Sequence, residues 1–286
     1  MKDEQRPRPG LGRRRSRLSD EETARRMLEA ATAAVNRSGL TVSLGHISFE
    51  DAIRDAGVSR SAAYRRWPYK DLFFSDLLTE LARAATPAAI AHDETSELIR
   101  RVALDHLDWL TTPELRHALG VELLRQGALR DFETMYGSTE WRTYLALHAT
   151  FMSLDDGDLR AEVQSALGRS EQGFISRIAT SYERVAGLIG YRLRPETGAT
   201  FETLATLASA TMRGLVIMAL STPDIAIRRV EAEPFGAAEP AEWSLPAAGI
   251  AGLAFTFLEP DPTVEWDDGR IRDLRETLES PAGLVT

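Results

Sequence analysis

The N-terminal part of the sequence consists of short apolar segments, each bracketed by residues that begin or end helices. Ser19 and Ser48 are each followed three residues later by an acidic residue, a spacing typical of the capping box that opens a helix. Behind each serine, apolar side chains recur three or four positions apart, as they do along one helix face. Gly39 follows the first segment and Gly57 the second, and glycine commonly ends helices.

Two further helices are predicted in the same part of the chain. Ser59 can cap a third helix over about residues 60–66, and Pro68 suits the first turn of a fourth. Gly57 leaves a tight turn between the second and third helices, which is the arrangement of a helix-turn-helix. We therefore expect residues 19–85 to form one helical unit.

The rest of the chain has apolar stripes at helical spacing and no convincing alternation typical of strands. The predicted helices lie within residues 96–110, 113–126, 139–152, 170–191, 201–220 and 245–258. Residues 228–244 and 260–286 are acidic and interrupted by proline or glycine, so we expect a loop and a loose tail. The predicted fold class is all-α, with a larger C-terminal helical bundle after the N-terminal unit.

Composition limits the kinds of site that the chain can hold. There is no cysteine, which excludes disulfides and thiolate metal sites, and the five histidines lack the paired spacing of a zinc motif. We expect no metal and no cofactor. No run reaches about 18 consecutive apolar residues, and the N-terminal residues lack the apolar stretch of a secretory signal. We therefore expect a cytoplasmic protein with no membrane partner.

The charge is distributed unevenly along the chain. The formal net charge is -9 at pH 7, yet residues 1–85 hold 16 Lys and Arg against 12 Asp and Glu, whereas residues 86–286 hold 18 against 31. The local field of the N-terminal part therefore suits a polyanionic partner. Residues 1–18 are basic and expected to be disordered, as a nucleic-acid arm or as a simple solvated tail.

The predicted third helix has two chemically different faces. Because a helix turns about 100° per residue, Ala63 and Trp67 share one face. The opposite arc holds Ser61, Tyr64 and Arg65, with Arg60 at its edge. Such a helix fits a DNA major groove, where arginine bonds to guanine and serine or tyrosine to bases or phosphates. The alternative is an ordinary basic helix pair with buried aromatic residues.

The string "AGVSRSAAYRRWPYKDLF" resembles the helix-turn-helix of the TetR family of transcriptional regulators. In that family, Ala-Gly-Val-Ser is followed by a tyrosine, an aromatic residue and a lysine, which correspond here to Tyr64, Trp67 and Lys70. The resemblance is strong over residues 20–85, and beyond them only the all-helical layout is similar.

The resemblance implies which residues face DNA. On the helices these are Ser48, Ser59, Arg60, Ser61, Tyr64, Arg65 and Lys70. The basic tail, with Arg13, Arg14 and Arg15, is expected to lie as an arm in the adjacent minor groove. The sequence departs from the family pattern at Ala52-Ile53, at Ala63 and in a longer loop after the first helix. The two substitutions concern the packing between the second and third helices, not the polar arc.

The resemblance also implies a homodimer that reads a near-palindromic operator, with one half-site for each subunit. The helices at about 200–221 and 245–258 would form the dimer contact. The predicted contact residues are Leu215, Met218, Ala248, Gly252 and Phe255. The alternative is that both helices are core helices of one subunit.

A cavity for a small-molecule effector is expected among the helices from about residue 95 to 190. Effector cavities are mostly apolar with a few polar groups. The candidate wall residues are Trp109, Trp141, Tyr144, His148, Phe151, Met152, Phe174 and Tyr182. Ordinary core packing is the alternative for each of them.

These expectations define a domain organisation and a function. The domains are a disordered basic arm (1–18), a helix-turn-helix DNA-binding domain (19–85), a helical ligand-binding and dimerisation domain (86–266) and an acidic C-terminal tail (267–286). We expect a DNA-binding transcriptional regulator and not an enzyme, specifically a repressor that an unidentified small molecule releases from its operator. The alternatives are an all-helical enzyme and a protein-interaction module whose basic helix meets an acidic partner.

Overall fold

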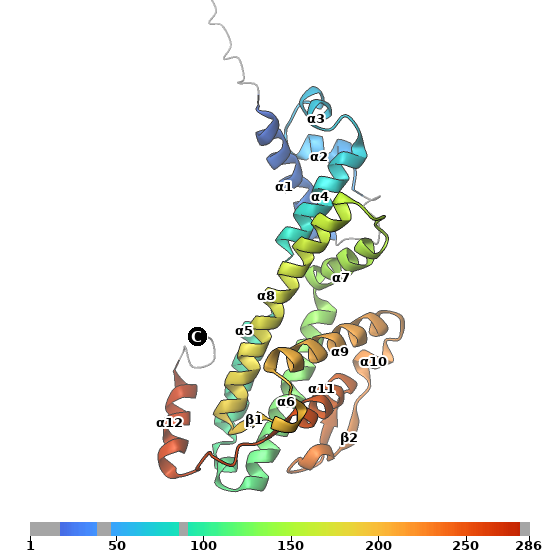
Figure 1. Cartoon of the computed structure of the whole chain (residues 1–286). Helices are drawn as coiled ribbons and strands as arrows, with labels where there is room; N and C mark the ends of the chain where they lie inside the picture. The colour runs from blue at the N-terminus through green and yellow to red at the C-terminus, as the bar shows by residue number, and fades with distance from the viewer. Residues whose placement is uncertain (1–17, 39–46, 86–90, 281–286) are drawn as a thin grey trace, which may run out of the picture.

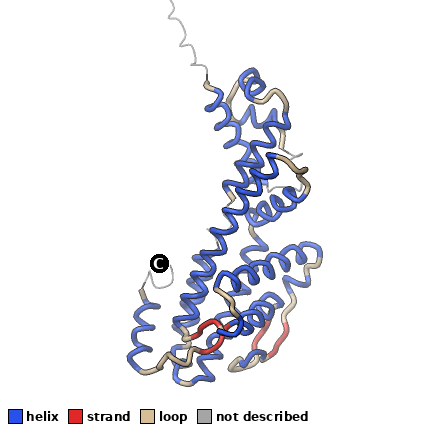
Figure 2. The backbone as a smooth tube through the Cα atoms, viewed as in Figure 1, coloured by secondary structure: helices blue, strands red, loops and turns tan. Residues whose placement is uncertain are grey.

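The computed structural model describes residues 18–38, 47–85 and 91–280. Helices account for most of these residues, as Figure 1 and Figure 2 show, so the predicted all-α class is confirmed. A small helical unit lies at one end of the molecule and a larger helical body at the other. The long helix α8 (Asp158–Leu188) runs between them (Figure 1).

The N-terminal unit begins its first three helices where the sequence predicted. Its helices are α1 (Asp20–Ser38), α2 (Phe49–Asp55), α3 (Arg60–Arg66) and α4 (Lys70–Ala84). Ser19, Ser48 and Ser59 each accept a hydrogen bond from the backbone N–H three residues on, at 3.1–3.2 Å. Gly57, in the turn between α2 and α3, has φ 63°, a left-handed conformation that favours glycine. Gly39, expected to end the first helix, lies outside the described residues.

Pro68 ends α3 and does not begin α4, so the prediction for this proline was wrong. α4 starts at Lys70, and its N-cap residue Tyr69 makes no side-chain capping bond. Trp67, the residue before the proline, has an extended backbone with φ -128° and ψ 90°. A following proline favours this conformation because its ring collides with a helical neighbour.

Three aromatic rings form the centre of the N-terminal unit. Phe49 of α2, Trp67 and Phe73 of α4 are buried and meet edge to face, with ring centroids 5.1–6.4 Å apart. The Trp67 Nε1–H donates to Asp76 Oδ2 of α4 at 2.9 Å, so the indole is hydrogen-bonded as well as buried. Each such ring pair adds about 0.5–1.5 kcal/mol beyond the area it buries. The rings therefore fix the end of α3 against α2 and α4.

The larger body packs the remaining helices around α6 (Pro113–Gly137) and α8. Its other elements are α5 (Ala91–Asp105), η2 (Leu107–Thr111), α7 (Thr139–Met152), η3 (Pro195–Thr197), α9 (Phe201–Ser221), α10 (Asp224–Ile227), η4 (Pro234–Gly236), α11 (Leu245–Phe257) and α12 (Asp268–Glu279). α6 and α8 extend well beyond the predicted segments. The extra first turns of α8 bury Val163, Ala166 and Leu167 against the N-terminal unit, and this tertiary packing is what makes a mainly polar stretch helical.

Two short antiparallel strand pairs were not predicted. β1 (Tyr191–Leu193) pairs with β4 (Leu258–Pro260), and β2 (Val230–Ala232) pairs with β3 (Ala241–Trp243), drawn in red in Figure 2. The expected loop at 228–244 is therefore a hairpin in part. Strands of three residues are too short to show an alternating apolar pattern, which explains the miss.

The predicted loose tail is wrong where it covers α12. Leu274 and Leu278 of α12 are buried against α5 and η2, in one apolar cluster with Val102 and Leu107. The guanidinium of Arg270 lies 4.8 Å from the ring centroid of Trp266, just before the helix. Residues 281–286 lie outside the described part of the chain.

One helix in the described ranges, α9, is long and apolar enough to cross a membrane by length and composition alone. It packs against α6, α8 and α11 on one side, as a core helix of a helical bundle also does. Leu204, Ala208 and Val216 lie on that buried side. This feature by itself favours neither environment.

Replacing Leu278 tests whether α12 is part of the folded body. We predict that Leu278→Ala lowers the free energy of unfolding by about 2–3 kcal/mol, because it removes buried methyl groups and leaves a void. Urea denaturation measures the change. Arg275→Ala, at an exposed position on the same helix, is the matched control and should change stability by less than about 0.5 kcal/mol. Equal, small effects of both variants would contradict a packed α12.

Candidate nucleic-acid interface and ligand cavity

The helix α3 buries one face and exposes the other. Ala62, Ala63 and the capping residue Trp67 are buried. All seven residues predicted to face DNA on the helices are exposed: Ser48, Ser59, Arg60, Ser61, Tyr64, Arg65 and Lys70. Arg13, Arg14 and Arg15 lie outside the described residues. The capping bonds of Ser48 and Ser59 place these hydroxyls at the starts of α2 and α3, and Ser61 Oγ lies 3.1 Å from Ser59 Oγ.

Glu50 of α2 lies among the predicted DNA-facing residues, and sequence reasoning missed it. Glu50 Oε2 accepts from Arg60 Nη2 at 2.7 Å, and Glu50 Oε1 accepts from the Tyr64 hydroxyl at 2.9 Å. These two bonds, the one from Arg60 first, hold the pKa of the Glu50 carboxyl below its usual value. The charge of Lys70 contributes in the same direction. Arg60 and Tyr64 are therefore oriented by a carboxylate in the free protein.

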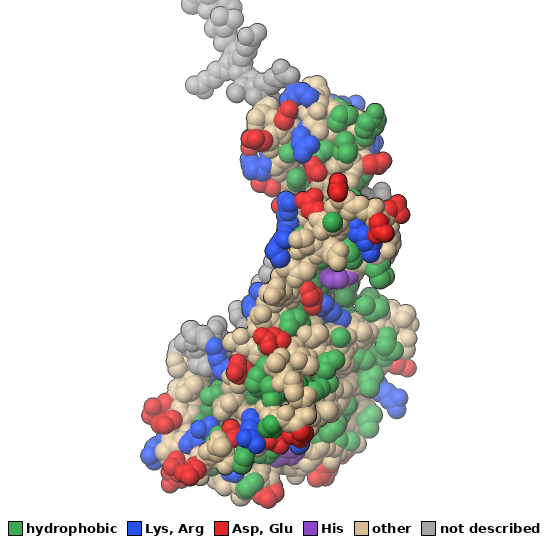
Figure 3. Space-filling model, viewed as in Figure 1, with side chains coloured by type: hydrophobic (Ala, Val, Ile, Leu, Met, Phe, Trp, Pro, Cys, Tyr) green, Lys and Arg blue, Asp and Glu red, His purple; other side chains and the backbone are tan. Residues whose placement is uncertain are grey.

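The other arginines of α3 are also paired with acids. Arg65 Nη2 lies 2.6 Å from Asp20 Oδ1 at the start of α1. Arg66 Nη2 lies 2.9 Å from Asp76 Oδ2 of α4, and its guanidinium lies over the Trp67 ring at 5.0 Å from the centroid. Acidic and basic side chains are correspondingly intermixed over this unit on the face seen in Figure 3. The face is polar, and the three arginines of α3 on it are each paired with an acid.

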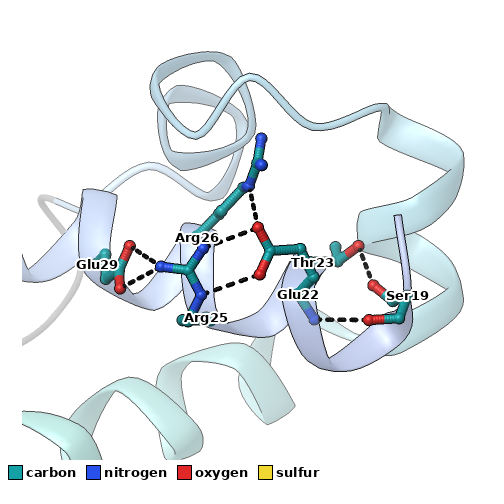
Figure 4. A network of polar contacts seen from close by, with 6 residues as sticks. All are labelled: Ser19, Glu22, Thr23, Arg25, Arg26 and Glu29. Atoms are coloured by element: carbon teal, nitrogen blue, oxygen red, sulfur yellow. Dashed lines mark hydrogen bonds and ion pairs between the residues drawn. The ribbon is translucent and has the colours of Figure 1, made fainter. Parts of the chain in front are cut away.

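A second polar network stabilises the start of α1 (Figure 4). Glu22 accepts from Arg25 at 2.8 Å and from Arg26 at 2.6 Å, and Arg25 also bonds to Glu29 at 2.7 Å. The bonds from Arg25 and Arg26, in that order, lower the pKa of Glu22 to about 2. Two more cations of the N-terminal unit are thus engaged by acids. The excess of positive charge in residues 1–85 lies in residues 1–17, because residues 18–85 hold 9 Lys and Arg against 10 Asp and Glu.

The larger body contains a partly open cavity of about 460 Å³, lined by residues of α5, α6, α7, α8, α9 and α11 and by Tyr191 and Leu258 of the β1–β4 pair. Trp141, Phe174 and Tyr182 line it, as the sequence predicted. The prediction placed the cavity among residues 95–190 only, yet α9 and α11 supply walls through residues such as Met212 and Ile250. This part of the prediction was wrong because contacts between distant helices are not visible in a local pattern.

The other candidate wall residues lie away from the cavity. Trp109 packs on the His106 ring, with centroids 4.4 Å apart. Tyr144 is buried and its hydroxyl donates to Glu171. His148 Nδ1 lies 3.0 Å from the Tyr144 carbonyl oxygen, as in ordinary helix packing.

The last two candidates lie near the end of α7. Met152 is 76% exposed. Phe151 lies under the Arg160 guanidinium, 4.6 Å from the ring centroid. For these residues, and for Trp109, Tyr144 and His148, the core or surface alternative therefore holds.

The predicted dimer residues fall into two groups. Phe255 lines the cavity, and a Cβ on Gly252 would meet the Phe235 ring at 3.6 Å, so both residues pack within one chain and not outward. Ala248 and Leu215 are half-buried. Met218 is exposed, and so are its apolar neighbours on α9, Leu207, Ile217 and Leu220. Of the predicted residues, only Met218 is fully available to a second subunit.

Asp131 of α6 is an acidic residue in the cavity wall, and sequence reasoning missed it. Its carboxyl Oδ1 accepts from the Thr95 hydroxyl of α5 at 2.6 Å. It keeps some accessible surface because it faces the cavity, but the surrounding protein removes it from bulk water. This desolvation, offset in part by the Thr95 bond, raises its pKa to about 6. The sequence signal is slight: Leu124, Asp131 and Met135 share one face of a helix.

Two neutral polar atoms beside the cavity lack a hydrogen-bond partner in the described chain, Trp141 Nε1 and Ser209 Oγ. Neighbouring side chains cover both atoms, so a ligand reaches them only if the wall shifts. Unpaired buried donors of this kind cost about 1–3 kcal/mol each. A rearrangement of the wall that gave these two atoms hydrogen-bond partners would remove this cost.

Arg213 of α9 links the cavity wall to α7. Its guanidinium pairs with Glu171 of α8 at 3.0 Å and lies 5.2–5.7 Å from the ring centroids of Trp141, Tyr144 and Phe174. Trp141 and Phe174 line the cavity, whereas Tyr144 does not. A shift of the Trp141 or Phe174 ring therefore changes the surroundings of Arg213, which also contacts Tyr144 of α7.

Within the described ranges, no group of three or more His, Asp or Glu side chains is placed to hold a metal ion. Comparison with models of known protein families gives no match, and comparison with curated proteins gives none. Arguments about function therefore come from the chain itself.

The ionisation of Asp131 should cost stability. The pKa of this carboxyl is 3.8 in the unfolded chain and about 6 in the folded protein. Between these two pH values the folded state binds more protons than the unfolded state, so the free energy of unfolding falls as pH rises from about 4 to about 6. The shift corresponds to about 3 kcal/mol at neutral pH. We predict that Asp131→Asn raises the free energy of unfolding by about 2–3 kcal/mol at pH 7.5, and by much less near pH 4.

Urea denaturation at the two pH values measures this difference. Glu114→Gln, an exposed acid-to-amide change on the same helix, is the control and should change stability by less than about 0.5 kcal/mol. A gain for Asp131→Asn that is absent, or equal at both pH values, would contradict the desolvated carboxylate.

Proposed function

We propose that the protein is a transcriptional regulator of the TetR type, a cytoplasmic repressor that binds duplex DNA as a homodimer and releases it when a small molecule occupies the cavity. The observation that carries this proposal is the two-sided helix α3. It buries Ala63 against its neighbours and carries Ser61, Tyr64 and Arg65 on a solvent-exposed face. We propose that α2, the Gly57 turn and α3 act as a helix-turn-helix.

The exposed face has the chemistry that a major groove requires. The guanidinium of Arg65 can form two bonds to guanine, while the hydroxyls of Ser61 and Tyr64 can bond to bases or phosphates. Lys70 begins α4, where backbone N–H groups that lack helical partners also attract phosphate. Retention on DNA through this face separates the proposal from a protein-interaction module.

The acids that pair with these arginines support specific binding over general attraction to polyanions. In the free protein, Glu50 holds Arg60 and Tyr64, and Asp20 holds Arg65. On binding, DNA must break or reposition these ion pairs. Contacts to the correct bases compensate for the lost pairs and contacts to other bases do not, so one sequence is favoured. The pairs are solvent-exposed, where such ion pairs contribute only about 0–1 kcal/mol, so the exchange is within reach of a phosphate or base contact.

A homodimer would use the outer side of α9. Leu207, Ile217, Met218 and Leu220 are exposed there, and the exposed positions between them, Ala210 and Gly214, are small. An apolar, uncharged helix face of this kind is typical of a subunit interface. Two subunits related by a two-fold axis would present two copies of α3 to a near-palindromic site.

The cavity and the DNA-facing unit share α7 and α8, which gives a route for release. Trp141 of α7 lines the cavity, whereas Leu147 of the same helix packs in the core of the N-terminal unit. α7 packs on α1 and α4, and the N-terminal part of α8 packs on α4. A ligand that moves the Trp141 wall therefore biases the placement of α3 through α7. Switching a dimer from mostly bound to mostly free needs about 5 kcal/mol of differential ligand binding.

Removing two groups of the α3 face tests the proposal. We predict that Tyr64→Ala with Arg65→Ala weakens binding to a selected DNA site by at least about 30-fold, since each of the two lost base or phosphate contacts costs about 1–3 kcal/mol. Fluorescence anisotropy with labelled duplex measures the affinity. Arg169→Ala on α8, which removes an exposed arginine far from α3, should leave it unchanged. Unchanged DNA binding in the double variant would refute the assignment of this face.

Glu50 offers a test in the opposite direction. We predict that Glu50→Gln strengthens binding to random-sequence DNA and steepens its salt dependence by about one phosphate contact, because Arg60 no longer has an anionic partner. Discrimination between selected and random sites should fall. Glu162→Gln, which frees Arg83 near the C-terminal end of α4 from a similar exposed pair with α8, is the control. Weaker binding of Glu50→Gln to both kinds of DNA would contradict the proposed role of Glu50.

A further inference from the structure

We infer that the cavity binds an apolar organic cation whose positive charge lies against the carboxylate of Asp131. The inference names the class of effector for the proposed regulator. Only the claim that this ligand controls DNA binding rests on the proposed function. Binding itself follows from the cavity.

The size and walls of the cavity fit a drug-sized apolar molecule. Its volume of about 460 Å³ is within the range of small-molecule sites. Most of its wall is aliphatic or aromatic, including Leu123, Val185 and Ile189. A ligand of mainly polar character would lose hydrogen bonds to water there without replacing them.

Most polar groups of the wall lie on α5, α6 and α8, and Ser209 lies on α9. Thr95 lies on α5, Asp131 on α6, and Ser181 and Tyr182 on α8. The Thr95 hydroxyl already donates to Asp131 at 2.6 Å, which orients the carboxylate without neutralising its charge. The cavity thus combines apolar walls with one anionic group.

The charge of Asp131 has no compensating cation within the part of the chain that the structure describes. Its neighbour Arg130 pairs with Glu94 of α5 at 2.5 Å, and Arg213 of α9 pairs with Glu171. The residues of α11 include no charged side chain. A desolvated carboxylate that keeps its charge near neutral pH is costly unless a partner is supplied, and here a ligand is the group that can supply one.

The remaining titratable groups near Asp131 are on α8. The ring of Tyr182 lines the cavity, and desolvation, with the nearby charge of Asp131, raises the pKa of its hydroxyl, so this group stays neutral. Arg177 also lines the cavity but is exposed, and a Cβ placed on Gly173 would lie 3.5 Å from its Nη1. It points back along α8, and no ion pair joins it to Asp131 within the described residues.

An ammonium group is the charge that this site favours. An anionic ligand would place a second negative charge beside a carboxylate in a poorly solvated site, and a neutral ligand would leave the carboxylate unpaired. A protonated amine gives a charge-assisted hydrogen bond, and the faces of Tyr182 and Trp141 can also stabilise a cation. Binding is therefore coupled to the ionised form of Asp131.

A matched set of ligands tests the inference on the full-length protein. The probes are naphthylmethylamine, naphthylmethanol and naphthoate, which share a ring and differ in charge; the trimethylammonium derivative separates charge from N–H donation. Isothermal titration calorimetry at about pH 7.5 should show the amine binding about 30-fold more tightly than the alcohol, the size of one charge-assisted hydrogen bond. Naphthoate should bind more weakly than the alcohol.

The Asp131→Asn variant should bind the amine and the alcohol within about threefold of each other, while Glu114→Gln keeps the wild-type preference. Thermal unfolding checks that both variants are folded. Wild-type protein at about pH 5 gives a second measurement that needs no variant. Protonation of the carboxyl should weaken amine binding about tenfold and leave alcohol binding unchanged.

Three results would overturn the inference: equal affinity for amine and alcohol in the wild type, a preference that survives Asp131→Asn, or no binding by any probe up to about 1 mM. Calorimetry needs no DNA, so its outcome is independent of the proposed function. Amine binding by a protein that never binds DNA would sustain the inference and refute the regulator. DNA binding with no amine preference would support the regulator and refute the inference.

Discussion

The orientation of α3 depends on one buried side chain, the indole of Trp67. It is fully buried among Phe49 and Phe73 and hydrogen-bonded to Asp76. Burial of an indole removes a large apolar area from water, and the bond to Asp76 prevents the N–H from being left unsatisfied. Because Trp67 caps α3, its position determines that Tyr64 and Arg65 point to solvent. The proposed DNA contacts follow from this packing.

Helix α7 connects the cavity with the N-terminal unit. α7 contributes Trp141 to the cavity wall and Leu147 to the N-terminal core, so one rigid helix belongs to both environments. Arg213 holds the cavity side of α7 through Tyr144 and Glu171. A half-buried cation that lies beside three rings has few alternative arrangements, which suits an element that switches between discrete positions.

Local features of the chain were predictable and long-range ones were not. The helix α3 was predicted with its observed bounds because its Ser59 cap and its apolar spacing lie within a few residues. The pairs of Glu50 with Tyr64 and of Asp131 with Thr95 join different helices, and no periodicity indicates them. α12 was missed because an acidic, short amphipathic segment is helical only when a partner surface buries Leu274 and Leu278.

Selection of bound sequences from random duplex DNA tests the central claim most directly. A dimer that presents two copies of α3 should enrich a two-fold symmetric sequence, with half-site centres separated by about one helical turn or a multiple of it. Enrichment of such a site by the wild-type chain would support the account. Recovery of random sequences with no shared half-site, at a salt concentration where the chain is folded, would contradict it.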